Sequence, residues 1–280
     1  MRMAGRSKSG TFMLYAVAWL IALIWLVPFL GVFMASIRPL SEISRGWWKF
    51  ETFTPTFKNY VGAWSHPAAP ISRGMVNSLK VAIPATIFPV LAASVAAYGF
   101  ARFSFRGRDI LFILIVALMT LPQQMIAVPL FRIMNQLGAV DSYTGLMIVH
   151  SAWGIPWILY FMRNYFSALP IEVEEAAKVD GASDWRIFLQ IVMPMALPAV
   201  ASSSVLQFMW VWSDFFLALI LIYSPTKLLA TQRVPLLRGV YHVDWGILAA
   251  GSIIVMAVPI IVFALMQRYY IRGMVGWVSK

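Results

Sequence analysis

The sequence predicts an all-α integral membrane protein with six transmembrane helices, and three observations indicate this fold class. The chain of 280 residues is 61% hydrophobic and only 12% charged, about half the charged fraction of a soluble domain. Its mean hydropathy is +0.77. Its charged residues leave six apolar stretches, each long enough to cross a bilayer as a helix of about 20 residues.

The apolar stretches give one transmembrane domain over residues 1–280. The predicted spans are, in order, about residues 12–36, 78–101, 110–133, 144–164, 194–223 and 246–268. A polar loop of about residues 165–193 joins the fourth span to the fifth. Every span contains a proline, from Pro28 to Pro259. Proline kinks a helix, which favours a transporter that must flex, although proline is also commoner in membrane helices in general.

Basic residues predict the orientation of the spans. Arg2 and Arg6 precede the first span, and Arg102, Arg106 and Arg108 lie in the short connection between spans two and three. Short basic segments stay in the cytoplasm, so we expect both termini there. The first loop, about residues 38–73, is also basic, but long loops count less in this rule. The net charge of +11 therefore reflects topology and contact with anionic lipid headgroups, not nucleic acid.

Several kinds of catalytic or metal-binding site are excluded by the sequence. There are no cysteines, so no disulfide framework or thiolate metal site exists. His66, His150 and His242 are far apart and form no metal-ligand pair. There is no G-x-x-x-x-G-K-[ST] segment to hold a nucleotide and no G-x-S-x-G nucleophile turn. We therefore expect no cofactor in this chain and no enzymatic activity of its own.

The loop between spans four and five concentrates negative charge. Five of the 11 acidic residues of the chain lie between Glu172 and Asp184. The stretch predicts helix, turn, helix: Pro170 suits a first helical position, Gly181 a left-handed helix end, and Ser183 the cap of the next helix. Pro194 then bends the chain into span five. Acidic residues around a turn of small residues suit docking into a complementary groove, and an ordinary amphipathic surface helix is the alternative interpretation.

A polar line in span five is the candidate solute path. Ser203, Gln207, Trp210 and Asp214 share one helix face, and Gln123 of span three could join them. A hydroxyl, an amide, an indole and a carboxylate suit a sugar, but the same groups could simply join helices by hydrogen bonds. Asp214 also keeps open an ion-coupled secondary transporter, and a membrane protein with no transport path is a third alternative.

The loop sequence resembles the EAA motif of ABC importer permeases. That motif reads EAA, three residues, G, nine residues, I, one residue, LP, and this chain departs from it only by a methionine in place of the leucine. Other segments resemble the carbohydrate branch of the family, in the manner of the second maltose-type permease subunit: "FKNY", "AYGFARFSFRGR" and "WSDF". The resemblance implies that the loop forms a coupling helix on an ATPase subunit through Glu175, Ala176, Ala177, Asp180, Gly181, Ala182, Ile191 and Pro194.

The resemblance also implies the assembly and the cargo. It implies a multi-pass protein of a prokaryotic plasma (inner) membrane that pairs with a second permease, two ATPase subunits binding ATP and Mg²⁺, and an external solute-binding protein. The chain would form half of the path for a sugar, oligosaccharide or related polyol or glycoside. The loop between spans five and six, about residues 223–246, would reach into the binding protein. In this family the tight sugar contacts can lie mainly in the partner permease.

Overall fold

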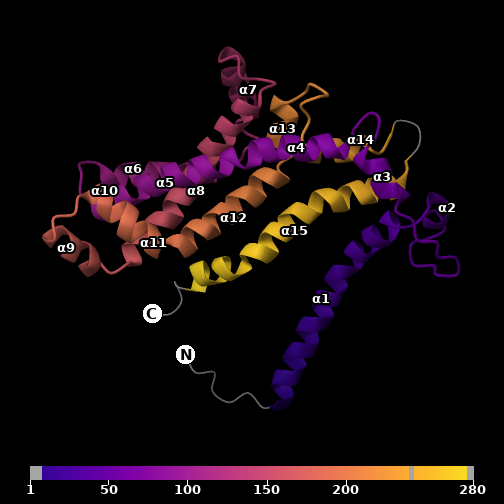
Figure 1. The fold of residues 1–280 in the computed structure, drawn as a ribbon, viewed down its shortest axis with the longest axis horizontal. Coiled ribbons are helices and arrows are strands. Elements are labelled where there is room, and N and C mark those ends of the chain that lie inside the picture. The colour runs from indigo at the N-terminus through magenta and orange to yellow at the C-terminus, as the bar shows by residue number, and fades with distance from the viewer. Residues whose placement is uncertain (1–7, 240–242, 276–280) are drawn as a thin grey trace. The chain divides into compact units, whose positions relative to one another are not determined.

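The computed structural model describes residues 8–239 and 243–275, and every regular element in those ranges is a helix (Figure 1). The chain divides into two compact units, Met1–Ile71 with Val234–Val255 and Ser72–Arg233 with Met256–Lys280. Arg2 and Arg6, which predict the orientation, and His242 lie outside the described ranges.

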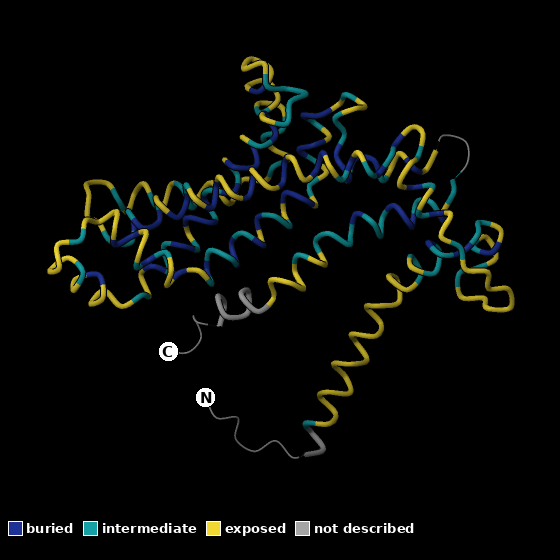
Figure 2. The backbone as a smooth tube through the Cα atoms, in the orientation of Figure 1, coloured by how far each residue is buried: buried dark blue, intermediate teal, exposed yellow. Residues whose placement is uncertain are grey.

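The first unit contains an isolated apolar helix and a folded loop. Its helices are α1 (Lys8–Ser36), α2 (Leu40–Ile43), α3 (Lys58–Trp64), the end of α14 (Ala230–Leu236) and the beginning of α15 (Trp245–Val275). The mean hydropathy of α1 reaches 2.5, yet none of its most apolar stretch is buried. Figure 2 shows α1 exposed along nearly its whole length. A helix that is apolar on all sides needs lipid or another protein around it.

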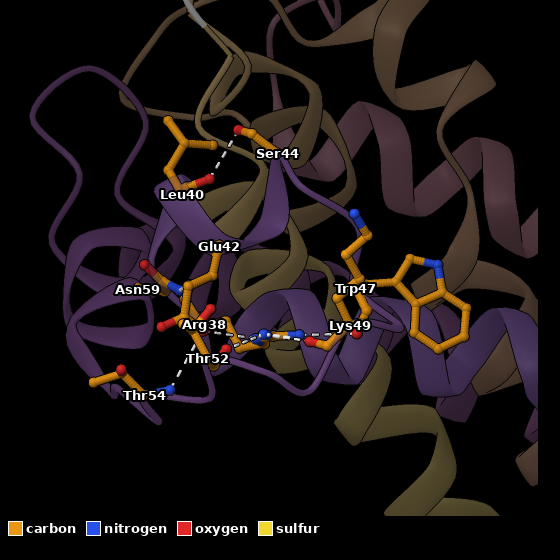
Figure 3. A network of polar contacts seen from close by, with 9 residues as sticks. All are labelled: Arg38, Leu40, Glu42, Ser44, Trp47, Lys49, Thr52, Thr54 and Asn59. Carbon is orange, nitrogen blue, oxygen red and sulfur yellow. Dashed lines mark hydrogen bonds and ion pairs between the residues drawn. The ribbon is translucent and has the colours of Figure 1, made fainter.

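A buried arginine organises the loop after α1, as Figure 3 shows. The Arg38 side chain is 1% exposed and donates from Nε to Glu42 Oε2 at 2.9 Å. Its other nitrogens donate to the carbonyls of Trp47, Lys49 and Thr52. Burial alone would raise the pKa of Glu42, but hydrogen bonds from Arg38 and Thr54 outweigh it and lower the pKa. The loop is therefore a folded element closed around one guanidinium group.

The second unit is a helix bundle built on α5, α8 and α12. Its helices, besides parts of α14 and α15, are α4 (Ile71–Ala82), α5 (Pro84–Arg102), α6 (Arg108–Ala117), the 3₁₀ turn η1 (Leu118–Thr120), α7 (Ala127–Gln136), α8 (Tyr143–Ala168), α9 (Glu172–Val179), α10 (Asp184–Ile187), the π-helix η2 (Phe188–Val192), α11 (Met193–Met195), α12 (Leu197–Ser213) and α13 (Phe216–Leu221). In Figure 1, α9 and α10 lie at one end of this bundle and α7 and α13 at the other.

Two apolar cores fill the bundle. One core joins Ala97 of α5, Met162 of α8 and Phe188 of η2, and the other joins Ala85 of α5, Leu146 of α8 and several residues of α12 and α13. Between the two cores, α8 and α12 carry polar and aromatic side chains from about residue 150 to 157 and from about 203 to 210. The bundle therefore has a polar layer partway along its length.

The described residues contain four helices long and apolar enough to cross a membrane: Thr11–Ser36, Ile71–Arg102, Tyr143–Ala168 and Trp245–Gln267. Asp184–Met195 and Leu197–Ser213 would make a fifth span if the bent pair counts as one, and the bend between them is 75°. The helical membrane fold is thus confirmed in its coarse form, with four to five apolar spans, and the count of six stays a prediction.

The third and fifth predicted spans are not single helices, and proline explains the first of these breaks. Residues 110–133 contain α6, η1 and part of α7. Leu121 has extended backbone angles, φ −76° and ψ 119°, because the ring of Pro122 disfavours a helical conformation in the residue before it. Residues 194–223 contain parts or all of α11, α12 and α13, with breaks at Ala196 and at Asp214.

Candidate coupling surface and translocation path

The polar loop folds as helix, turn, helix. Helix α9 ends in a Schellman motif, in which Ala182 N donates to Ala177 O at 2.9 Å and Gly181 N to Lys178 O at 3.0 Å. Gly181 has a φ of +81°, so the predicted left-handed end is confirmed. Ser183 accepts from the backbone of Arg186 at the start of α10, which confirms the predicted cap.

The start of α9 differs from the prediction by two residues. Pro170 lies before the helix and not at its first position, because α9 begins at Glu172 after one turn residue. The predicted bend into the next helix does follow Pro194, and it is centred at Ala196 between α11 and α12. Both prolines therefore lie near helix starts, where a missing backbone donor costs little.

One face of α9 is open and the other is held by the bundle. Glu175, Ala176, Asp180 and Gly181 are exposed, as is Pro194, while Ala177, Ala182 and Ile191 pack partly against the first core. An added Cβ at Gly181 would meet nothing within 4 Å, so the surface beside the turn is empty. All eight residues of the predicted coupling set thus belong to one continuous segment, and most of their side chains are free to contact another protein.

Glu174 fixes α9 to α5. Its side chain is 6% exposed. Its Oε1 accepts from Arg102 Nε at 2.7 Å and its Oε2 accepts from Tyr98 OH at 3.0 Å. Arg102 also donates to Leu169 O at 3.2 Å. The sequence alone did not single out this carboxylate. Glu174 directly precedes Glu175, the glutamate of the motif, but it is buried against the bundle whereas Glu175 is exposed.

Gln207 joins three helices. Its Nε2 donates to Ala85 O of α5 at 3.1 Å and to His150 O of α8 at 3.3 Å. Its Oε1 accepts from Trp157 Nε1 at 3.0 Å. The side chain is held in place by Gly154, where an added Cβ would lie 2.6 Å from Gln207 Nε2. The amide therefore connects helices in this structure, as one of the two sequence interpretations expected.

The other predicted path residues lie near Gln207 but face different surroundings. Gln123 and Trp210 line a small cavity together with Gln207, and Trp210 is 53% exposed. Ser203 is fully buried and donates to Val200 O in its own helix. Asp214 lies just beyond α12, where its Oδ2 accepts from Ala218 N at 3.1 Å and so caps α13. The cavity thus brings together Gln123, Gln207 and Trp210, while Asp214 does not line it.

Sequence reasoning gave no role to His150. Its side chain is 3% exposed, lines the same cavity, and lies 3.8 Å from Asp214 Oδ2 through its Nε2. The signal was available, because an ionisable residue inside an apolar span marks a functional site by default.

The segment after α13 is folded and not an extended loop. Gln232 donates to the carbonyls of Ala218 and Ile222, and it accepts from Leu229 N. Arg233 is 1% exposed and donates to Leu228 O and Pro225 O. Burial lowers the pKa of Arg233. These two polar side chains thus bond to the backbone of α13 and of the segment that precedes α14.

Comparison with known proteins identifies the class. Residues 85–275 match the family described as "Binding-protein-dependent transport system inner membrane component". The matched region includes both the candidate coupling segment, residues 172–194, and the cavity. The chain belongs to this family, and it is an ABC transporter permease, a transport component of the inner membrane and not an enzyme.

Particular relatives extend over nearly the whole chain. A probable ABC transporter permease of Pyrococcus horikoshii is 59% identical and covers 93% of this chain and 95% of its own. An osmoprotective compounds uptake permease of Synechocystis is 40% identical, covering 91% and 88%. An alpha-glucoside transport system permease of Rhizobium meliloti is also 40% identical, covering 84% and 64%.

A solved structure has the same fold. The structure of a bacterial ABC transporter involved in the import of the acidic polysaccharide alginate matches with a TM-score of 0.77 at 22% identity, covering 96% of this chain and all of the matched chain. At this identity the likeness speaks for the fold alone. Family membership disfavours the ion-coupled alternative.

Proposed function

We propose that this permease forms half of the path of an ATP-driven importer for a sugar, an oligosaccharide or a related polyol or glycoside. The cargo class is supported by the alpha-glucoside permease among the relatives and by the cavity, whose indoles and amides suit hydroxyl-rich solutes. The osmoprotectant permease supports the wider polyol and glycoside range.

The observation that carries the proposal is the two-sided α9 segment. Its open face presents Glu175, Ala176 and Asp180 beside an empty left-handed turn, while Glu174 ties the opposite face to α5. Small residues let another surface approach the backbone closely, and a buried tether passes any displacement of α9 to the bundle. We infer that an ATPase subunit, which binds the ATP and Mg²⁺, docks on Glu175, Ala176, Ala177, Asp180, Gly181, Ala182, Ile191 and Pro194.

The remaining partners are proposed from the family to which the chain belongs, and the orientation from the proposed docking on α9. The proposed complex contains a second permease, two ATPase subunits and an external solute-binding protein, all within or beside membrane lipid and without nucleic acid. Docking of an ATPase on α9 places that end of the bundle in the cytoplasm, with both chain termini on the same side. In this proposal the chain crosses the membrane six times, and the broken segments α6–α7 and α12–α13 each cross it once. An even number of crossings puts both termini on the same side.

Uptake by the reconstituted complex tests the function. Proteoliposomes carrying the whole complex, with ATP inside and no ion gradient, should take up one or more of maltose, trehalose and methyl α-glucoside when the binding protein is present. Asp214→Asn should reduce this uptake without changing its dependence on ATP, because the amide keeps the shape and part of the capping hydrogen bond. Uptake that ignores ATP and follows an imposed proton or sodium gradient would refute the proposal.

A further inference from the structure

The polar layer of the bundle contains a buried nitrogen with no hydrogen-bond partner. Across the part of the chain that the structure describes, only two buried side-chain polar atoms lack a partner, His150 Nε2 and Arg163 Nε. The guanidinium of Arg163 lies over the ring of Phe112, 4.8 Å from its centroid. His150 has no such compensation, because Asp214 Oδ2 at 3.8 Å is beyond hydrogen-bonding distance. A buried polar atom of this kind costs free energy unless something else binds it.

The walls around His150 have the chemistry of a sugar site. The cavity is lined by the half-buried rings of Trp153 and Trp157 from α8, by the exposed ring of Trp210 from α12, and by Gln123. His150, Trp153 and Trp157 fall at spacings of three and four, so one face of α8 presents all of them. Flat aromatic rings stack on the apolar face of a pyranose, and a small number of polar groups that point into the site fix the orientation of the sugar.

Hydrogen bonding inside the cavity separates scaffold from free groups. The Gln207 amide is engaged with Ala85, His150 and Trp157, so it holds the Trp157 ring in place. Of the buried side chains that line the cavity, His150 therefore has the polar nitrogen that is left to meet a solute. A neutral imidazole nitrogen can donate to or accept from a hydroxyl, depending on its tautomer, and a sugar hydroxyl can take either part.

We propose that His150 is the polar anchor of a carbohydrate subsite in this permease, with Trp153 and Trp210 as its stacking surfaces. The inference rests on the proposed function and deepens it, because it gives this chain its own contact with the cargo. The cavity holds about 10 Å³ in this structure, room for about one water molecule. The subsite is thus closed here, and the sugar enters when its wall moves.

The wall that moves is the segment carrying Gln123. It lies between η1 and α7, where residues 121–126 are not helical, so it can shift without breaking the hydrogen bonds of a long helix. The α8 and α12 walls are held together by Gln207. A site with one fixed side and one adjustable side suits a solute that must be released as the path opens.

Substitutions at His150 test the subsite in the whole complex. In proteoliposomes with ATP and binding protein, uptake of whichever probe among maltose, trehalose and methyl α-glucoside the wild type transports is compared with binding-protein-stimulated ATP hydrolysis. His150→Phe removes the polar nitrogen and should lower uptake roughly tenfold, with stimulated hydrolysis within about twofold. His150→Gln places an amide near Nε2 and should retain about a third of wild-type uptake or more. His66→Gln is the matched control, because His66 lies in the partly buried loop after α3 and does not line the cavity, and this variant should transport normally.

A second position guards against a folding defect. Trp153→Phe should keep most uptake and Trp153→Ala should lose it, again with hydrolysis retained, because the ring at 153 is only partly buried. Wild-type uptake in His150→Phe would overturn the inference. So would equal loss of uptake and of stimulated hydrolysis in His150→Phe and His150→Gln, since that result describes a packing residue. If the wild type itself transports none of the three probes, the proposed cargo class fails first and this inference fails with it.

Discussion

Replacing Glu174 with glutamine should loosen the coupling segment without removing it. Glutamine has the shape of glutamate, but one of its two oxygens becomes an NH₂ group. That group must face either Arg102 Nε or Tyr98 OH, which now donate to the carboxylate at 2.7 and 3.0 Å. If it faces Arg102, two donors oppose each other. In either orientation the guanidinium loses its counter-charge.

The expected cost follows from the burial of the pair. The Arg102 and Glu174 side chains are 10% and 6% exposed. Removing one partner of such a pair costs about 3–5 kcal/mol when burial is complete. Arg102 keeps its bond to Leu169 O and glutamine keeps one acceptor, so we expect about 2–3 kcal/mol for Glu174→Gln. The loss falls on the junction of α9 with α5, so coupling should suffer more than assembly.

The assay compares two glutamates of the same helix. Glu172→Gln is the control, because Glu172 is exposed and has no ion pair among the described side chains. The complex with Glu174→Gln should unfold at lower denaturant and hydrolyse more ATP per sugar transported than the control complex. A double-mutant cycle with Arg102→Gln should show strong coupling. Additive effects in that cycle, or a Glu174→Gln complex that matches Glu172→Gln in both measurements, would refute the reasoning.

Three further predictions concern backbone and charge. Gly181→Val should cost about 1–3 kcal/mol of backbone strain at its positive φ and should reduce ATPase co-purification, whereas Gly181→Asn should be tolerated. Gly154→Ala should displace Gln207 and cost about 1–3 kcal/mol, whereas Gly99→Ala, where an added Cβ meets nothing within 4 Å, should be neutral or stabilising in a thermal assay. Asp141→Asn should destabilise the complex at neutral pH by on the order of 1–2 kcal/mol after allowance for screening, and the difference from wild type should vanish toward pH 2.

The sign of the Asp141 effect comes from its surroundings. Burial alone would raise the pKa of Asp141, but hydrogen bonds from Ser224, Tyr223 and Lys227 outweigh it and lower the pKa from 3.8 to about 2. The stabilisation is therefore complete above pH 3.8 and lost as pH falls through about 2. A constant difference between wild type and Asp141→Asn over this range would contradict the assignment. The prediction for Gly181 would be contradicted if Gly181→Val bound the ATPase as well as the wild type does. The prediction for Gly154 would be contradicted if Gly154→Ala and Gly99→Ala were equally stable.

Local signals predicted local structure well. Gly181 was recognised as a left-handed helix end because the residue type and its position after an amphipathic stretch leave few alternatives. The long apolar helices were recognised because lipid requires about 20 apolar residues. Pro122 lies where the third predicted span is interrupted, although hydropathy alone joined its pieces into one span, and Pro194 was correctly read as the bend into α12.

Long-range partners could not be read in the same way. Glu174 meets Tyr98 and Arg102 across more than 70 positions, and no spacing rule connects them. Asp214 looked like a charge within a span, and only the structure shows that α12 ends just before it and that it caps α13. Gln207 had two interpretations because an amide can serve a solute or a neighbouring helix, and the choice depends on which carbonyls happen to face it.

The hydrogen bonds by which Gln207 joins α5, α8 and α12 also have a consequence for the insertion of the protein into the membrane. Helix α1 is apolar on every side and exposed along its length, so it can leave the translocon alone and wait in lipid. Helix α12 cannot do so equally well, because the Gln207 amide would enter hydrocarbon without its partners. Those partners, Ala85 O and His150 O, belong to helices synthesised earlier. The order of the chain thus puts the acceptors in the membrane before the donor arrives, and we expect α5, α8 and α12 to pack together once α12 has been inserted.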